Sequence, residues 1–381
     1  MNDVPYFKSF MQTQTLPTIE IQKSSLSEFA DEPVKSAKLF HLTYIADTSN
    51  GITRTKSGKN FRYFLNEKSI TDEEVLIRIK KLVIPPAWND VWICAKENGH
   101  LQATGIDAMH RKQYRYHTLW NKMRSETKYF RLYDFGKNLP ALRRQLEKDI
   151  AEQGLHLKKI LATIVMLMEQ TSIRIGNSFY EKLYGSYGLT TLKNRHVNIK
   201  GNTLLFTFKG KKGVDHKISL HSKQLALIVK KCLDVPGKEL FQFYDDSGEI
   251  HSVHSGMVNE YIQEISGKEF SAKDFRTWSG SISAITICNI QGSCEEQNAK
   301  QKINEILDEV AKHLGNTRNV CRKYYVHPSI LELYQTNKLN KYLPELNKPV
   351  KTKDKSGYSP EENVLMKILR SDYKTANTIT V

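Results

Sequence analysis

Apolar and polar residues follow two different patterns along the chain, and the change between them divides it into two parts. Between residues 39 and 116 the apolar positions form short runs, such as 41–45 and 61–64, in which apolar and polar residues alternate. Alternation interrupted by turn residues is typical of half-buried strands. From about residue 130 the apolar positions recur at helical spacing instead. The pattern predicts an α+β protein with a small β-rich N-terminal domain and a larger, mainly α-helical domain.

The β-rich part is expected to span residues 37–122. A strand over 92–94 runs into a Glu-Asn-Gly-His turn and returns over 101–104, which is a hairpin signature. Residues 71–82 have helical spacing and stop before two prolines. The first 36 residues mix Gln, Ser, Thr and Pro without any sustained period, and we expect them to form a flexible tail.

The helical part is expected to span residues 123–346. Its clearest helix is marked by apolar residues at one face, namely Leu157, Ile160, Leu161, Ile164, Val165 and Met168. Between residues 196 and 220 the pattern predicts a three-stranded β meander with glycine-containing turns. Residues 347–381 are rich in lysine and poor in apolar anchors, so they are expected to form a basic, partly ordered tail.

The composition also indicates what kind of partner the protein binds. The 381 residues carry a net charge of +16, with a pI near 9.4. A balance this basic favours a polyanionic partner such as nucleic acid, although a generic basic surface is the alternative. The five cysteines form no C-x-x-C pair, so a disulfide framework or zinc site is not expected and a reducing compartment fits. With no signal segment and no long apolar run, we expect a soluble, intracellular protein.

The last segment of the β-rich part indicates how nucleic acid would be bound. Residues 111–116 alternate cations with aromatic residues and one glutamine. On a strand, Arg111, Gln113 and Arg115 share one face, and Lys112, Tyr114 and Tyr116 share the other. Cations suit phosphates, an amide can read a base edge, and tyrosines contact sugars or stack. The alternative is an edge strand kept soluble by its charges.

Two cations in the helical part occupy unusual positions. Arg174 lies between two isoleucines beside the apolar helix, so it either pairs with a buried carboxylate or faces a site. Lys211 lies on a hairpin tip bracketed by glycines. A lysine on a turn is usually just solvated, but it can also serve as a general acid delivered to a leaving oxygen.

The remaining candidates come from the last third of the chain. Arg276 lies in the first turns of a predicted helix, where backbone N–H groups and a cation together favour a phosphate. Residues 315–325 run from a helix-ending glycine through a cluster of cations to Tyr324 and Tyr325. A phenol, with a pKa of about 10, is a poor nucleophile unless cations stabilise the charge that develops on the phosphate it attacks.

Taken in chain order, these residues resemble the active-site pentad of the type IB DNA topoisomerases, specifically the compact poxvirus-like and bacterial branch. The pentad residues are Arg174, Lys211, Arg276, Asn316 and Tyr325. The resemblance covers nearly the whole chain from about residue 40, and it includes 84–88, 99–105, 111–116, 174–177, 188–194, 208–211 and 274–278. It implies the fold shared by tyrosine recombinases and type IB topoisomerases.

The resemblance also implies a mechanism. Tyr325 would attack a DNA phosphodiester to give a 3′-phosphotyrosyl link, and Lys211 would protonate the departing 5′-oxygen. Arg174 and Arg276 would clamp the non-bridging oxygens. Asn316 occupies the place of a histidine in the viral members, so it could donate a hydrogen bond but not exchange protons. Neither ATP, a metal nor another cofactor is implied.

The implied partner is double-stranded DNA, relaxed by one monomer that closes around it as a clamp, in the cytoplasm at the nucleoid. Gln113, Tyr114 and Tyr116 would contact the major groove, while Asn177 and Tyr180 would lie at the DNA near Arg174. No membrane or nucleotide cofactor is expected. Whether the site is assembled without DNA stays open.

Three alternatives follow from the same residues. Tyr324 is a competing nucleophile, although the family spacing from Asn316 selects Tyr325. A tyrosine recombinase would typically carry histidine three residues before its second arginine, where this chain has Lys273. An inactive DNA-binding protein is disfavoured because all five catalytic positions hold competent residues.

Overall fold

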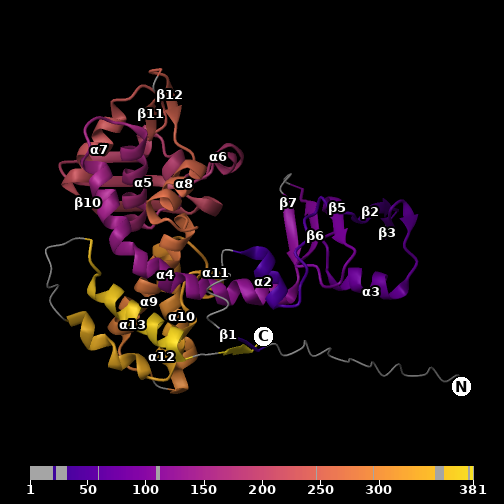
Figure 1. The fold of residues 1–381 in the computed structure, drawn as a ribbon. Coiled ribbons are helices and arrows are strands. Elements are labelled where there is room, and N and C mark those ends of the chain that lie inside the picture. The colour runs from indigo at the N-terminus through magenta and orange to yellow at the C-terminus, as the bar shows by residue number, and fades with distance from the viewer. Residues whose placement is uncertain are drawn as a thin grey trace, which may run out of the picture. The chain divides into compact units, whose positions relative to one another are not determined.

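The structure is a computed structural model of the chain, and it describes residues 20–22, 32–58, 60–108, 112–245, 247–294, 296–347, 356–375 and 378–380. It divides into two compact units, drawn in Figure 1: a small unit of residues 1–128 with 375–381, and a large unit of residues 129–374. The small unit is rich in strands and the large unit in helices, so the predicted α+β class is confirmed. The boundary was predicted at residue 122, whereas the two units divide after residue 128, inside the long helix α4 (Thr118–Ala151).

The small unit is built on one antiparallel sheet with strand order β4-β3-β2-β5-β6-β7. The strands are β2 (Gly51–Ser57), β3 (Asn60–Leu65), β4 (Lys68–Ser69), β5 (Asn89–Cys94), β6 (Leu101–Ile106) and β7 (Lys112–Tyr116). Helix α3 (Glu73–Lys81) begins at Asp72, whose side chain accepts hydrogen bonds from the N–H groups of Glu74 and Val75. Ile79 of α3 packs against the sheet residues Ile52 and Ile93. The predicted hairpin and helix are therefore both present.

The termini of the described chain meet in the small unit. Strand β1 (Glu20–Gln22) pairs antiparallel with β13 (Thr378–Thr380). Helix α2 (Pro33–Leu39) follows, with Pro33 at its first turn, where the missing N–H is not needed. Most of the predicted tail over residues 1–36 lies outside the described residues.

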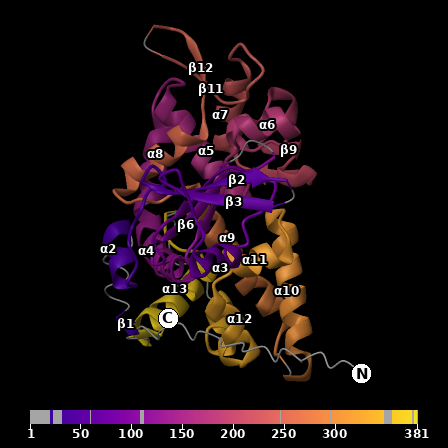
Figure 2. The same cartoon turned by 90° about the vertical axis from the view of Figure 1, so that its right-hand side faces the viewer.

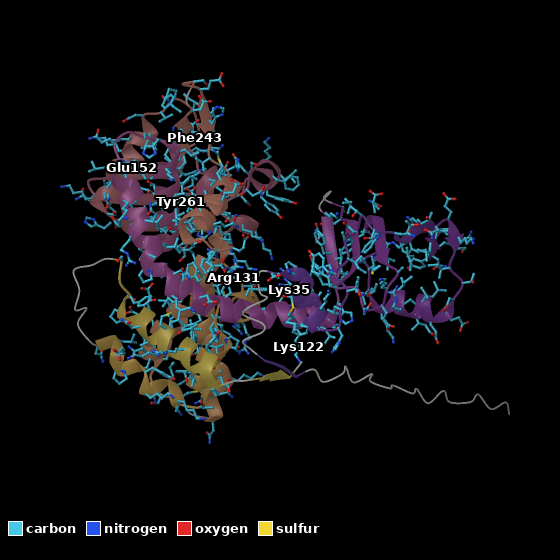
Figure 3. All side chains as sticks on the ribbon, in the orientation of Figure 1. Lys35, Lys122, Arg131, Glu152, Phe243 and Tyr261 are labelled. Atoms are coloured by element: carbon cyan, nitrogen blue, oxygen red, sulfur yellow. The ribbon has the colours of Figure 1, made fainter. Side chains whose placement is uncertain are left out.

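The large unit is a helical assembly around α5 (Leu157–Thr171), which is buried along most of its length. Figure 3 marks Phe243 and Tyr261, which belong to this core, and the hydroxyl of Tyr261 donates to the buried carboxylate of Asp149. The other helices of this unit are α6 (Ser178–Tyr184), α7 (Lys223–Leu233), α8 (Ser255–Ser266), α9 (Ala272–Gln291), α10 (Ala299–Leu314), α11 (Arg318–Tyr324), α12 (Pro328–Gln335) and α13 (Pro360–Thr375). Short 3₁₀ turns are η1 (Leu189–Thr191), η2 (Asn194–His196), η3 (Lys211–Gly213), η4 (Glu296–Asn298), η5 (Lys338–Lys341) and η6 (Leu343–Asn347).

The predicted meander is present as a three-stranded antiparallel sheet. It consists of β8 (Val197–Lys200), β9 (Thr203–Lys209) and β10 (Asp215–His221), in the order β10-β9-β8. The register pairs Phe208 with His216 and Lys209 with Asp215, so the β9–β10 turn carries η3 and Lys211. A further two-stranded hairpin joins β11 (Gln242–Tyr244) to β12 (Ile250–Ser252).

Helix α13 differs from the predicted basic, partly ordered tail over 347–381. Val364, Leu365, Ile368 and Leu369 are buried in the core of the large unit, at the spacing of one helix face. The carboxylate of Glu362 is also buried; it accepts from the Arg143 guanidinium and, at 2.9 Å, from Nε1 of Trp278. Lysines on both sides of this stretch outweighed its apolar spacing in the prediction. The lysine-rich residues 348–355 lie outside the described residues.

No helix among the described residues has the length and apolar character needed to cross a membrane.

Candidate active site

Arg174 lies three residues after the end of the buried helix α5. Ser172 ends that helix in the left-handed conformation, and the next side chain, Ile173, is buried and fixes the chain that follows. The Arg174 guanidinium donates from Nη2 to the carbonyl oxygen of Gly315, at 2.8 Å, and to Oδ1 of Asn316. Among the described residues its recorded partners include no carboxylate, so the arginine is held without being neutralised.

Arg276 lies on α9, whose start is fixed by Ser271 and Asp274. The Asp274 carboxylate accepts from the N–H of Ser271 at 2.8 Å and from its hydroxyl at 3.0 Å. Arg276 is only 5% exposed. Its Nη1 donates to the carbonyl of Ser172, and its Nη2 donates to the carbonyl of Leu314 at 2.8 Å. Its Nε is buried and has no hydrogen-bond partner within the described part of the chain.

The end of α10 holds both guanidinium groups. Gly315 ends the helix with a φ of +60°, a conformation that favours glycine. The carbonyls of Leu314 and Gly315, which accept from Arg276 and Arg174, belong to the negative end of the helix dipole. Helix α10 packs against α9 and against α11 in this region (Figure 2). Within the described residues, backbone carbonyls therefore support the two cations, and no acidic side chain forms an ion pair with either of them.

Tyr325 follows directly after α11 and contacts α9. Its N–H donates to the carbonyl of Cys321 at 3.0 Å, and its own carbonyl accepts from the hydroxyl of Ser281 at 3.2 Å. A side chain at Gly280 would place its Cβ 2.8 Å from that carbonyl, so the glycine permits this close approach. The guanidinium carbon of Arg276 lies 5.2 Å from the centroid of the Tyr325 ring. Tyr324, in contrast, is 40% exposed and its ring lies near the ammonium of Lys323.

The electrostatics of the site follow from burial and from the proximity of the two arginines. Burial, and then the charge of Arg276, lowers the pKa of Arg174 to about 10, while Tyr325 and Cys321 oppose the shift. Burial also lowers the pKa of Arg276, and the phenol of Tyr325 opposes this. Arg174 stays charged at neutral pH. A phosphate would relieve the repulsion between the guanidiniums by lying against both.

Asn316 joins Arg174, Arg276 and Tyr325 in one arrangement. Its N–H donates to the carbonyl of Ala311 at 2.8 Å, which continues the end of α10. Its Oδ1 accepts from Arg174, and its Nδ2 makes only a long contact of 3.4 Å with the carbonyl of Leu314. The amide N–H₂ group therefore keeps donor capacity for another acceptor.

Lys211 differs from the other four predicted catalytic residues, because it lies on the exposed turn η3. The turn is closed by hydrogen bonds from Gly210 N–H to the Val214 carbonyl, at 2.7 Å, and from Gly213 N–H to the Gly210 carbonyl, at 3.0 Å. Lys212 has a φ of +63°, which is uncommon for a residue with a side chain. Nothing in the described contacts joins the Lys211 side chain to the arginines.

Sequence reasoning missed His216, which lies between the Lys211 turn and the arginines. Burial, and then the charges of Arg174 and Arg276, lowers the pKa of His216, while Asp215 opposes the shift. Its partner in the meander is Phe208, which lies two residues before Gly210, but the contact of His216 with the arginine-holding segment has no signal in the local sequence.

The predicted nucleic-acid residues of β7 are partly engaged within the small unit. Lys112 forms an ion pair with Asp47 at 2.6 Å, and Nε2 of Gln113 donates to Asp107 at 2.9 Å. Tyr114 is exposed and stacks on Tyr116, with ring centroids 5.9 Å apart. The prediction for Arg111 lies outside the described residues.

Asn177 directly precedes α6 and Tyr180 lies on it, three and six residues beyond Arg174. Asn177 begins this helix, and its Oδ1 accepts from the N–H of Phe179 at 2.8 Å, a capping role that sequence reasoning did not assign. Tyr180 is 38% exposed and stacks on Tyr184, with ring centroids 6.0 Å apart. The exposed aromatic surface of α6 therefore includes Tyr184 as well as the single tyrosine predicted.

One group within the described residues has the composition of a metal site. Asp245, Glu249 and His251 lie on the hairpin between β11 and β12. The Asp245 carboxylate accepts from the hydroxyl of Ser247 at 2.6 Å, from the N–H of Glu249 at 2.9 Å and from His251. Hydrogen bonds from Ser247 and Glu249 hold the pKa of Asp245 well below its usual range. These contacts account for the group as a turn, and it contains none of the predicted catalytic residues.

The fold and the tyrosine–arginine site together point to a DNA topoisomerase I. The family model described as "Eukaryotic DNA topoisomerase I, catalytic core" matches residues 117–350, and "Bacterial DNA topoisomerase IB, N-terminal domain" matches residues 60–107. The chain belongs to the type IB DNA topoisomerase family, a family of isomerases.

Two relatives illustrate this membership. The chain is 32% identical over 297 residues to the DNA topoisomerase 1B of Acanthamoeba polyphaga mimivirus, an alignment that covers 75% of this chain and 88% of that protein. It is 24% identical over 235 residues to the DNA topoisomerase 1B of vaccinia virus (strain Copenhagen), an alignment that covers 60% of this chain and 71% of that protein. These matches favour a topoisomerase over the recombinase alternative.

Proposed function

We propose that this protein relaxes supercoiled duplex DNA by cutting one strand, allowing rotation and resealing the same strand. The observation that carries the proposal is the arrangement of Arg174, Arg276 and Tyr325 around the end of α10, with both guanidiniums held by backbone carbonyls. Family membership and the net charge of +16 support DNA as the substrate.

The proposed cleavage step conserves phosphoester bonds. The phenol oxygen of Tyr325 attacks the phosphorus and loses its proton to solvent, while the bond from phosphorus to the 5′-oxygen breaks. Lys211 gives a proton to that oxygen, which leaves as a 5′-hydroxyl. The products are a 3′-phosphotyrosyl link and a free 5′-hydroxyl, and resealing is the reverse reaction. Because one ester replaces another of similar energy, the cycle needs neither ATP nor a metal.

The two arginines and Asn316 would act on the transition state. Negative charge builds up on the non-bridging oxygens, and fixed donors in a water-poor site stabilise it without reorganising. A guanidinium has donors left after it binds one carbonyl, so Arg174 and Arg276 can hold a phosphoryl group as well. The Nδ2 group of Asn316 supplies one more hydrogen bond and no proton transfer.

We further propose that one monomer acts on DNA in the cytoplasm. All five catalytic residues come from the large unit of a single chain, so no second copy is needed to complete the set. All five cysteines are free and buried, which agrees with a reducing compartment.

The test is relaxation of supercoiled plasmid in EDTA without ATP. We expect a ladder of relaxed topoisomers from the wild type and none from Tyr325→Phe, which should still bind DNA. Tyr324→Phe is the matched control and should relax plasmid normally. A gel shift without relaxation by the wild type would support the inactive DNA-binding alternative, and products joined between two separate sites would support a recombinase.

The nucleophile is identified independently by digesting the covalent complex formed with nicked or suicide-cleavage DNA. Mass spectrometry should find the nucleotide on Tyr325. An adduct on Tyr324 or on another residue would overturn the assignment.

A further inference from the structure

His216 of β10 contacts both parts of the proposed active site. Its ring stacks on Phe208, with centroids 5.0 Å apart and planes 20° apart. A Cβ added to Gly210 would lie 2.6 Å from Cδ2 and Nε2 of the ring. A Cβ added to Gly315 would lie 2.6 Å from Cε1. The imidazole therefore fills the space between the residue before Lys211 and the residue before Asn316.

The two glycines have different reasons to be glycine. Gly315 ends α10 with a positive φ, which alone favours glycine. Gly210 has a φ of −91° and extended geometry, which residues with side chains adopt freely. The space at Gly210 is instead occupied by the His216 ring. The turn and the histidine are thus matched in shape.

The charge around the imidazole is positive. Arg174 and Arg276 lie within electrostatic reach of the ring, and Asp215 is the acidic group that acts on it. A side chain at Gly315 would also lie 3.6 Å from Nη1 of Arg174, so the ring and that guanidinium share one small space. Because burial and both arginines lower the pKa of His216, the ring is neutral at neutral pH and adds no repulsion to the site.

Lys211 needs such support more than the arginines do. Its turn is exposed and closed by short-range backbone hydrogen bonds, and lysine carries its charge on a flexible stem. A general acid must stay within hydrogen-bond reach of the oxygen that it protonates. Rigid contact between the turn and the arginine-holding segment would shorten the search of the ammonium group.

We propose that His216 is a positioning residue: its ring sets the separation between the Lys211 turn and the Gly315–Asn316 segment, so that Lys211 and Arg174 act on the same phosphate. This inference rests on the proposed function, because it takes Lys211 as the general acid. His216 itself neither touches the reacting atoms nor transfers the proton.

The test compares two DNA substrates in single-turnover cleavage by His216→Ala. One substrate has the normal 5′-oxygen at the cleavage site, and the other has sulfur in that bridging position. A thiolate, whose conjugate acid has a pKa of about 8.5, leaves without the protonation that an alkoxide requires. We expect the variant to cleave the oxygen substrate about tenfold to a hundredfold more slowly than the wild type, part of the usual contribution of a general acid. The sulfur substrate should restore its rate to nearly the wild-type value.

Equal slowing on both substrates would show that His216 supports the arginines or the fold, and it would overturn the inference. An unchanged rate on the oxygen substrate would also overturn it. His216→Gln, which keeps a neutral polar side chain, provides a second variant if the alanine variant unfolds. Melting temperature and DNA affinity are measured for each protein.

Lys211→Ala separates failure of this inference from failure of the proposed function. If sulfur rescues neither variant, the assignment of Lys211 as the acid fails. If sulfur rescues Lys211→Ala but not His216→Ala, only the role of His216 fails.

Gly210→Ala tests the shape match directly. The added methyl group would collide with the imidazole in the wild-type background but would find room beside His216→Ala. We expect Gly210→Ala to slow cleavage of the oxygen substrate in the first background and to have little further effect in the second. Equal effects in both backgrounds would overturn the inference.

Discussion

Arg174, Arg276 and Lys211 are all positively charged, yet the large unit surrounds them differently. The arginines are largely buried, and their donors meet the carbonyls of Ser172, Leu314 and Gly315. Lys211 lies on an exposed turn. The planar guanidinium can bind a carbonyl and still present further N–H groups, whereas an ammonium is a point charge on a flexible stem.

The difference agrees with the work proposed for each group. A residue that stabilises charge benefits from a fixed position and a low dielectric constant. A residue that gives a proton to the 5′-oxygen and takes it back when the strand is resealed must be able to reach that oxygen, which suits a side chain on an exposed turn. The contrast teaches that the proposed site combines two buried, backbone-held arginines with one exposed lysine.

Arg276→Lys is expected to have the largest effect, because it replaces a buried guanidinium by the kind of group found at Lys211. Lysine cannot reach the Ser172 and Leu314 carbonyls with a planar fork while also contacting phosphate. We expect cleavage to slow by about a hundredfold to a thousandfold, the range for removing a fixed donor from a charged transition state. Single-turnover cleavage measures this, and sulfur at the leaving position should not restore the rate. Arg144→Lys, at an exposed position, is the matched control; a rate within threefold of wild type for Arg276→Lys would contradict the comparison.

Asn316→Asp tests whether the arginines must remain unneutralised. The new carboxylate would pair with Arg174 and repel the phosphate. We expect cleavage to slow by about tenfold to a hundredfold, the equivalent of one hydrogen bond to a charged group. Asn316→Ala removes the donor without adding charge and should be less harmful. If alanine proved worse than aspartate in the same assay, the role of charge at this position would be refuted.

Glu362→Gln tests whether the helix that carries Arg276 depends on its contacts with α13 in the core. Glu362 of α13 binds Arg143 and Trp278, and Trp278 lies two residues from Arg276 on α9. Arg143 keeps its ion pair with Glu169, so the loss of one charge-assisted hydrogen bond should lower the free energy of unfolding by about 2 kcal/mol. Chemical denaturation measures the change, with the exposed Glu332→Gln as control. An unchanged midpoint would show that α13 does not stabilise this region.

The smallest expected effect is a dependence of stability on pH. Burial lowers the pKa of His196, His216 and His313 in the large unit, with nearby cations adding to the shift. The unfolded chain binds these protons near a pKa of about 6.5, above the folded values, so stability is full above that pH and declines as pH falls below it. Melting temperature should therefore decrease from neutral pH toward acid, and His216→Gln should flatten part of the decrease. A melting temperature that rose over this interval would contradict the assigned shifts.

Local sequence patterns predicted much of the fold. The helices around α5 and α9, the β5–β6 hairpin and the meander all appear where periodicity and turn residues indicated, because each depends on neighbours in the chain. Helix α13 was missed because flanking lysines outweighed the spacing of Val364, Leu365 and Ile368. Its burial depends on α4 and α9, more than 60 residues away in the chain, which no local pattern reveals.

The candidate site shows the same division. The resemblance identified five residues, and the structure brings Arg174, Arg276, Asn316 and Tyr325 together. The resemblance could not show that Asn177 caps α6 or that Asp107 accepts from Gln113, because those hydrogen bonds depend on side-chain rotamers. His216 was invisible for a related reason: its importance comes from contact with Gly315, which is 99 residues later in the chain.

The buried position of α13 has a consequence for how the protein is made. Every residue of the pentad precedes this helix in the chain, so all five have left the ribosome before the last apolar face of their unit is available. A nascent or prematurely ended chain that already contains Tyr325 would expose the surface that Leu365 and Leu369 normally cover. The order of synthesis therefore places the last part of this core after all five proposed site residues, and unfinished chains with this surface exposed are the kind that chaperones and proteases bind.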